Sequence, residues 1–204
     1  MKRGASGINA LIAVDKPLGL TSYDVVSCVR RAFGEKRVGH AGTLDPNASG
    51  VLVVGIGLAT KLLGLLTLDR KGYVADISFG VCTSTDDADG QVVATAAVPE
   101  NLCDEEFARA ACAKLVGTVD QLPPAVSAIS VDGKRAYQLV REGKTPELAA
   151  RRVSIYDATL LAVRKPSTTD ESLVWTVAFD VSKGTYIRSI ARDLGQSLGT
   201  EAHI

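Results

Sequence analysis

The sequence predicts an α+β fold, with a mixed but mostly antiparallel sheet flanked by helices. Long segments of alternating apolar and polar residues are joined by short turns, which is typical of antiparallel strands. Segments with apolar residues three and four positions apart, typical of helices, lie between them. Because the strands come in pairs, the order does not favour a doubly wound parallel sheet. The 204 residues are 46% hydrophobic, which suits one globular domain or a large and a small one.

The strand segments differ in how they are expected to be buried. The first two are short and apolar, so we expect them in the protein interior. The last two alternate over their whole length, and the polar sequence PSTTDE between them predicts a hairpin. The expected strands, in order, are 11–14, 51–57, 71–81, 91–98, 151–165 and 172–183.

The expected helices are marked by caps and by apolar faces. Thr21 or Ser22 caps the first, and Asp104 caps the third. The segment between the third and fourth helices is irregular, since Pro123 and Pro124 fix it as extended chain. In the last helix Ile187, Ile190, Ala191, Leu194 and Leu198 form an apolar face, as do Val25, Val26, Val29 and Phe33 in the first. The expected helices are 21–33, 59–68, 104–117, 135–143 and 184–199.

Composition excludes several classes of protein. Lysine plus arginine and aspartate plus glutamate both number 23, so a basic excess typical of nucleic-acid-coating proteins is absent. The four cysteines have no zinc-type spacing, and with two histidines we expect no metal site and reduced thiols in a cytosolic protein. The apolar stretch 51–66 is interrupted by Lys61 and Gly64, so we expect no membrane span. The chain stops directly after an apolar helix, so we expect it to be a fragment.

Asp45 lies in a glycine-rich loop between His40 and an apolar strand. Pro46 holds it extended and outside any helix. The simpler interpretation is a turn aspartate that bonds its own backbone, and the functional one is a catalytic carboxylate. Spacing alone favours the turn. His40 could be a base, but a lone histidine is more often a structural residue.

Two other motifs are rejected as ligand sites. The sequence VGIGLATK lacks the second glycine of a phosphate-binding loop, because Thr60 occupies that position. The sequence TDDADG lacks the first aspartate and the final glutamate of a calcium loop, so we interpret it as a polar turn.

Tyr73 and Arg188 also have two interpretations each. Tyr73 is either a core aromatic of a strand or a stacking platform for a base. Arg188 lies in the first turns of a helix, where a cation is unfavourable to the helix dipole. It is therefore either solvated or, if buried, paired with a carboxylate.

Five stretches, taken in order, resemble the bacterial TruB-type tRNA pseudouridine synthases over residues 11–203. The most specific is the GHAGTLDP block. The resemblance implies the pseudouridine synthase fold and a single catalytic domain over residues 1–204, incomplete at its C-terminus and lacking a PUA-type domain. The stretches are VDKPLGLTSYDVV, RVGHAGTLDPNASGVLVVGIGLATK, KGYVADISFGVCTSTDDADG, QLPPAVSAISVDGKRAYQLVREG and SKGTYIRSIARDLGQSLGTEAH.

The resemblance also implies the reaction and its residues. Uridine 55 in the T-loop of tRNA would be flipped out and isomerised to pseudouridine without cofactor or metal. Asp45 would be the catalytic residue, Arg188 its ion-pair partner and Tyr73 the residue that stacks on the base. His40 would assist flipping, and Lys16, Pro17 and Lys61 would line the cleft.

For RNA binding, the resemblance implies that residues 121–152 are a mobile segment that clamps the tRNA stem-loop, through cations that include Lys134, Arg135 and Arg141. The expected partner is the T-arm of tRNA, for a cytoplasmic monomer that binds neither metal nor membrane. The alternative function is a non-catalytic tRNA-binding or folding protein on the same scaffold.

Overall fold

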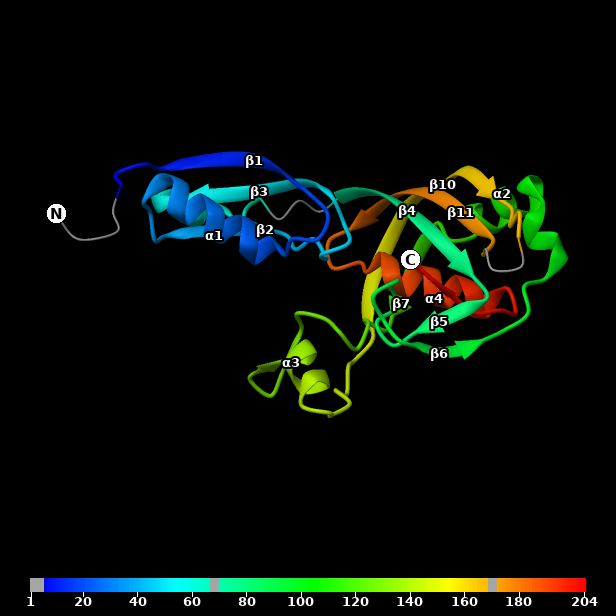
Figure 1. Cartoon of the computed structure of the whole chain (residues 1–204). Coiled ribbons are helices and arrows are strands. Elements are labelled where there is room, and N and C mark those ends of the chain that lie inside the picture. Colours follow the sequence, from blue (N-terminus) through cyan, green and yellow to red (C-terminus); the bar gives the residue numbers. More distant parts are fainter. Residues whose placement is uncertain (1–5, 67–69, 169–171) are drawn as a thin grey trace. The chain divides into compact units, whose positions relative to one another are not determined.

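Residues 1–68 and 69–204 form two structural units in the computed structural model, which describes residues 6–66, 70–168 and 172–204 (Figure 1). Every strand pairing among the described residues is antiparallel, in three- and five-stranded sheets and two small hairpins. The predicted α+β class and the mostly antiparallel pairing are confirmed. No helix in the described part of the chain is long and apolar enough to cross a membrane.

The first unit is a three-stranded sheet in the order β1-β3-β2, with one helix packed on it. Helix α1 begins after Thr21, whose side chain accepts from the Asp24 amide, and its apolar face packs on the buried residues of β3. Phe33, expected on that face, is 37% exposed because the helix ends there, at Gly34. The elements are β1 (Ala10–Lys16), α1 (Ser22–Phe33), β2 (Val38–Ala41), β3 (Gly50–Ile56) and the 3-10 helix η1 (Gly57–Leu62).

The helix expected over 59–68 is wrong in type and bounds. A short 3-10 helix, η1, takes its place and starts at Gly57, which has a left-handed φ of 62°. Residues 67 and 68 lie outside the described residues, as do residues 169–171 of the expected hairpin turn.

The second unit contains a five-stranded sheet in the order β12-β4-β11-β10-β7. Three of its strands were expected, because they are long and alternate. The other two, β7 and β12, were not, since β7 has five residues and β12 only two. The strands are β4 (Arg70–Phe79), β7 (Gly117–Gln121), β10 (Arg151–Arg164), β11 (Val174–Ser182) and β12 (Ala202–His203).

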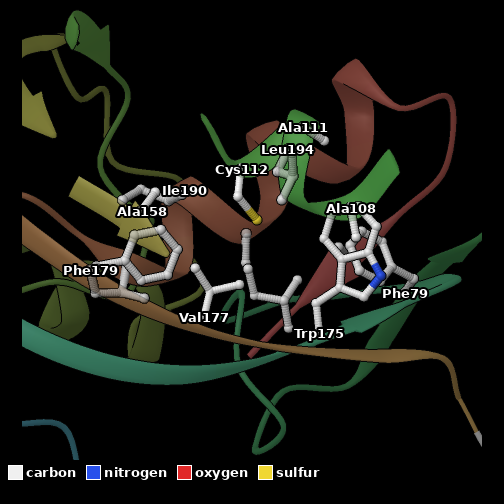
Figure 2. Packing of buried hydrophobic residues seen from close by; sticks show 14 of the residues in the cluster. Phe79, Ala108, Ala111, Cys112, Ala158, Trp175, Val177, Phe179, Ile190 and Leu194 are labelled. Carbon is white, nitrogen blue, oxygen red and sulfur yellow. The ribbon is translucent and has the colours of Figure 1, made fainter. Parts of the chain in front are cut away.

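Two helices cover one face of this sheet, α2 (Glu105–Ala113) and α4 (Ile187–Ser197). Figure 2 shows side chains from both helices meeting those of β11 in one apolar core. Trp175 of this core has no exposed surface, and its indole N–H donates to the Leu102 carbonyl at 2.9 Å. This packing fixes α4, and therefore Arg188, against the sheet.

Shorter elements complete the second unit. The hairpin of β5 and β6 contains the turn over residues 84–91, and the segment with α3 stands apart from the large sheet in Figure 1. These elements are β5 (Val81–Thr83), β6 (Val92–Thr95), the 3-10 helix η2 (Glu100–Cys103), β8 (Ser130–Val131), β9 (Lys134–Arg135) and α3 (Ala136–Arg141).

Candidate active site

The Asp45 loop connects β2 to β3 and is held by hydrogen bonds on both sides of the carboxylate. Before it, the Leu44 amide donates to the Ser22 hydroxyl at 3.0 Å, and that hydroxyl donates to the Leu44 carbonyl at 3.1 Å. After it, the Pro46 carbonyl accepts from the Gly19 amide at 2.8 Å. Asp45 itself is partly buried. The backbone on either side of this carboxylate is therefore fixed, while the side chain keeps some contact with solvent.

Lys16 supports the same loop from inside the unit. Its side chain is fully buried, and its Nζ donates to the carbonyls of Pro17, Leu20 and Pro46 at 2.9, 2.7 and 3.3 Å. Burial lowers the pKa of this ammonium group, and the nearby Asp45 carboxylate opposes the shift. Lys16 thus places a positive charge within electrostatic range of the candidate catalytic carboxylate.

Pro17 and His40 adjoin this loop, whereas Lys61 lies on η1, which follows the opposite end of β3. Pro17 is exposed and contributes its carbonyl to Lys16. The His40 Nδ1 meets the Gly42 carbonyl, at the start of the loop. Lys61 lies on η1 with its side chain exposed.

Tyr73 lies on β4, opposite Phe179 of β11. It is partly buried and packs against the core of the second unit, on the side of the strand that also presents Ile77 and Phe79. Burial falls from Phe79 toward the beginning of the strand, so Tyr73 lies at the margin of the core. A tyrosine at such a margin has one part packed and another part accessible to a ligand.

Arg188 is buried in the first turn of α4, with 5% exposure. Its Nη1 donates to the Thr85 carbonyl at 2.9 Å, and its Nη2 donates to the Val126 carbonyl at 3.1 Å. Its Nη1 also lies 3.6 Å from Asp87 Oδ2. The buried arginine therefore has a carboxylate neighbour, as burial at a helix N-terminus requires.

Asp87 is the functional candidate that the sequence reasoning missed. The turn that contains it was interpreted as structural only. The sequence did contain a hint, because two adjacent aspartates precede a glycine in this turn and Arg188 lies in the first turn of a later helix. Nothing in the spacing, however, could connect Asp87 to a residue 101 positions away.

The expected RNA-clamping segment includes β8, β9 and α3. Lys134 Nζ lies 2.8 Å from Glu142 Oε1, and Lys144 Nζ lies 3.1 Å from Oε2 of the same carboxylate. Arg135 donates to the Ala128 carbonyl at 2.7 Å, and the Arg141 guanidinium lies 5.6 Å from the centroid of the Tyr137 ring. All four cations are exposed. A positive surface is thus available, part of which is balanced by Glu142.

The predicted residues fall into both units. Asp45, His40, Lys16, Pro17 and Lys61 belong to residues 1–68, and Tyr73, Arg188 and the clamping segment belong to residues 69–204. The ion pair between Asp45 and Arg188 and the common cleft stay predictions. Over residues 6–66, 70–168 and 172–204 the structure has no group of three or more His, Cys, Asp or Glu that could hold a metal ion.

Curated relatives of this chain share its sequence over nearly its whole length. The tRNA pseudouridine synthase B of Mycobacterium sp. (strain KMS) is 53% identical over 201 residues, which covers 98% of this chain and 66% of that protein. The protein of the same name from Mycobacterium bovis is 50% identical over 194 residues, which covers 95% and 63%. The chain thus spans about two thirds of the length of these relatives.

Solved structures share the fold. In the crystal structure of a Cbf5-Nop10-Gar1 complex, one chain matches with a TM-score of 0.65 and 28% identity, over 95% of this chain and 45% of that one. An H/ACA RNP bound to a substrate RNA containing 2'-deoxyuridine matches with a TM-score of 0.63 and 25% identity, over 95% and 44%. Residues 30–187 match the family described as TruB family pseudouridylate synthase (N terminal domain), and the chain therefore belongs to this family.

Proposed function

We propose that this chain isomerises uridine to pseudouridine in tRNA, at position 55 of the T-loop, with Asp45 as the catalytic carboxylate. The observation that carries the proposal is the Asp45 loop, whose backbone is fixed by Ser22 on one side and by Lys16 and Gly19 on the other. A reacting carboxylate needs such a preorganised support. Family membership and the names of the relatives supply the reaction.

In the proposed reaction the bond between N1 of uracil and C1′ of the ribose breaks. The base turns while bound, and C5 forms the new bond to C1′. The proton lost from C5 is balanced by the proton gained at N1, so the reaction needs no oxidant. Asp45 acts as nucleophile or as the base that accepts a proton, and both roles require it to be ionised. The Lys16 ammonium is electrostatically coupled to this carboxylate.

The remaining residues are proposed to bind and position the RNA. Tyr73 stacks on the flipped uracil, which offsets about 1–3 kcal/mol of lost base contact. Arg188 pairs with Asp45, and His40, Pro17 and Lys61 contact the displaced nucleotides. Lys16 is assigned a positioning role, since its ammonium is buried among three carbonyls. The protein is proposed to act in the cytoplasm as a monomer, without metal or cofactor.

The deciding experiment measures pseudouridine formation in a T-arm stem-loop RNA, by tritium release from 5-tritiated uridine. Wild-type chain is expected to release tritium, and Asp45→Asn is expected to release none while it binds the RNA with nearly unchanged affinity. Asp15→Asn is a matched control, because Asp15 is exposed on β1. Turnover by Asp45→Asn would refute its catalytic role. Binding without turnover by the wild type would favour the non-catalytic tRNA-binding alternative.

A further inference from the structure

A second, largely buried ion pair lies one helical turn beyond Arg188. Arg192 follows Arg188 by four residues, so both lie on the same side of α4. Arg192 Nη1 lies 2.8 Å from Asp86 Oδ2, and the two side chains are only 15% and 11% exposed. Asp86 directly precedes Asp87, the carboxylate beside Arg188. Two adjacent aspartates therefore face two arginines that are one turn apart.

The backbone around Asp86 connects this pair to Arg188. Both groups of the turn that meet Arg188, the Thr85 carbonyl and the Asp87 carboxylate, flank Asp86 in sequence. Asp86 has a φ of 59°, in the left-handed region that a residue with a side chain adopts only at a cost. Its partly buried bond to Arg192 offsets that cost. Arg192 thereby fixes the conformation that presents both partners to Arg188.

Arg192 also holds the beginning of the 121–152 segment. Its Nη2 donates to the Leu122 carbonyl at 2.8 Å, and the Ser189 hydroxyl donates to the same carbonyl at 2.8 Å. The Val126 carbonyl, a few residues later, accepts from Arg188. Both chain segments that surround the Arg188 guanidinium are therefore fixed by Arg192.

Loss of Arg192 would do more than remove one contact. Burial raises the pKa of Asp86, and the guanidinium groups of Arg192 and, more weakly, Arg188 oppose that shift. Without Arg192, Arg188 would be the remaining guanidinium that stabilises the charged Asp86 carboxylate. Asp86 would then compete with Asp87 for Arg188 and draw the guanidinium out of place.

We propose that Arg192, acting through Asp86, is a positioning residue that fixes the orientation of Arg188 for the isomerisation. The proposal rests on the proposed function for its catalytic consequence. Arg192 itself touches neither the RNA nor the reacting atoms in this assignment. Its effect should therefore be mainly on the chemical rate, with a smaller effect on RNA affinity through the Leu122 carbonyl.

The test compares single-turnover rates at saturating T-arm RNA for Arg192→Gln, Asp86→Asn and the double variant. Each single variant should lose about ten-fold in rate with less than a two-fold change in RNA affinity, and the double variant should be no worse than the worse single one. Asp193→Asn is the matched control, because Asp193 contacts the same guanidinium from a more exposed side, 2.8 Å from Nη2. It should keep the wild-type rate. Each rate is divided by the fraction of protein that is folded. If Arg192 and Asp86 served only to stabilise the fold, these corrected rates would equal that of the wild type.

Side-chain NMR gives a readout that does not depend on activity. The Arg188 guanidinium signals, assigned by their loss in Arg188→Lys, should be in slow exchange in the wild type and broadened in Arg192→Gln. An unchanged rate in Arg192→Gln beside an active wild type would overturn the inference, as would equal losses in Asp193→Asn. An inactive wild type would instead contradict the proposed function, and the NMR signals would then decide the positioning role.

Discussion

The ammonium group of Lys16 lies where three backbone carbonyls meet, two from the turn after β1 and one from the Asp45 loop. Buried lysines are uncommon because the charged form loses its hydration, and this one keeps its hydrogen bonds only through those carbonyls. The residue therefore joins two loops that lie 30 positions apart in the sequence.

Replacement of Lys16 by methionine keeps the bulk of the side chain and removes its donors. We expect Lys16→Met to destabilise the first unit by about 1–3 kcal/mol, because three carbonyls lose a partner. Amide hydrogen exchange in β1 and β3 measures this locally. Lys61→Met should change exchange little, since Lys61 is exposed.

The stability difference between wild type and Lys16→Met should also depend on pH. Burial places the folded-state pKa of Lys16 below its ordinary value of 10.5, so the unfolded chain binds more protons in the alkaline range. Stability contributed by this group should therefore rise as the pH approaches 10.5. The difference in stability between wild type and Lys16→Met should widen as the pH rises through the lowered pKa of Lys16 toward 10.5. A constant difference would contradict the shifted pKa.

At the level of elements, α1 connects a helix cap to the candidate active site. The capping box of Thr21 and Asp24 starts the helix, and the next residue, Ser22, holds Leu44 of the Asp45 loop. Loss of the cap would loosen the first helical turn, which contains Ser22. The Asp45 loop would then lose its anchor at Leu44.

Thr21→Ala should destabilise the first unit by about 1 kcal/mol, as the loss of an N-cap does. The Thr21 hydroxyl and amide lower the pKa of Asp24, so this stabilisation is present above pH 3.8 and is lost as the pH falls through the lowered value. The variant should therefore have a flatter acid limb in unfolding followed by circular dichroism. Thr95→Ala, on an exposed strand position, should retain the wild-type acid limb.

Local periodicity predicted the elements whose signal lies within their own residues. The alternation of β4, β10 and β11 and the apolar spacing of α4 are of this kind, and all four are confirmed. In contrast, β7 was missed because its five residues are mostly exposed and its partner β10 begins 30 residues later.

The site was less predictable than the fold. Asp45 was ambiguous from spacing alone and became a catalytic candidate only through the family resemblance. The burial of Lys16 and the contact between Arg188 and Asp87 depend on residues distant in sequence, so neither pattern nor spacing contains them. The sequence of a polar turn and that of a helix N-terminus are the same whether or not the two segments are in contact in the fold.

At the scale of the whole chain, the zero net charge hides an uneven distribution. Residues 121–152 contain six cations and three acids. The ion pairs of Lys134 and Lys144 with Glu142 are exposed and therefore weak, so a phosphate can replace the carboxylate at small cost. The segment is thus suited to a polyanion even though the chain is neutral.

RNA affinity should accordingly fall steeply with salt. If about four phosphates are contacted, the logarithm of affinity falls with a slope of roughly −3 against log salt. Replacement of Lys134 and Arg135 by glutamine should flatten the slope and weaken binding, with little effect on the rate at saturating RNA. Fluorescence anisotropy at several salt concentrations measures this. The matched control is Arg109→Gln with Lys114→Gln, two exposed cations in the middle of α2 and just after its end. An unchanged slope in the first variant would place the main phosphate contacts elsewhere.

Trp175 is the only tryptophan of the chain, and it lies with no exposed surface against Phe79, with ring centroids 4.7 Å apart. Intrinsic emission above the tyrosine background therefore comes from a single indole in the core of residues 69–204. Because this indole is shielded from water, the native emission should be blue-shifted and resistant to quenching by iodide. Binding of RNA to exposed surfaces should leave that emission unchanged, so the intrinsic fluorescence can follow unfolding of this unit while a labelled RNA reports binding in the same sample.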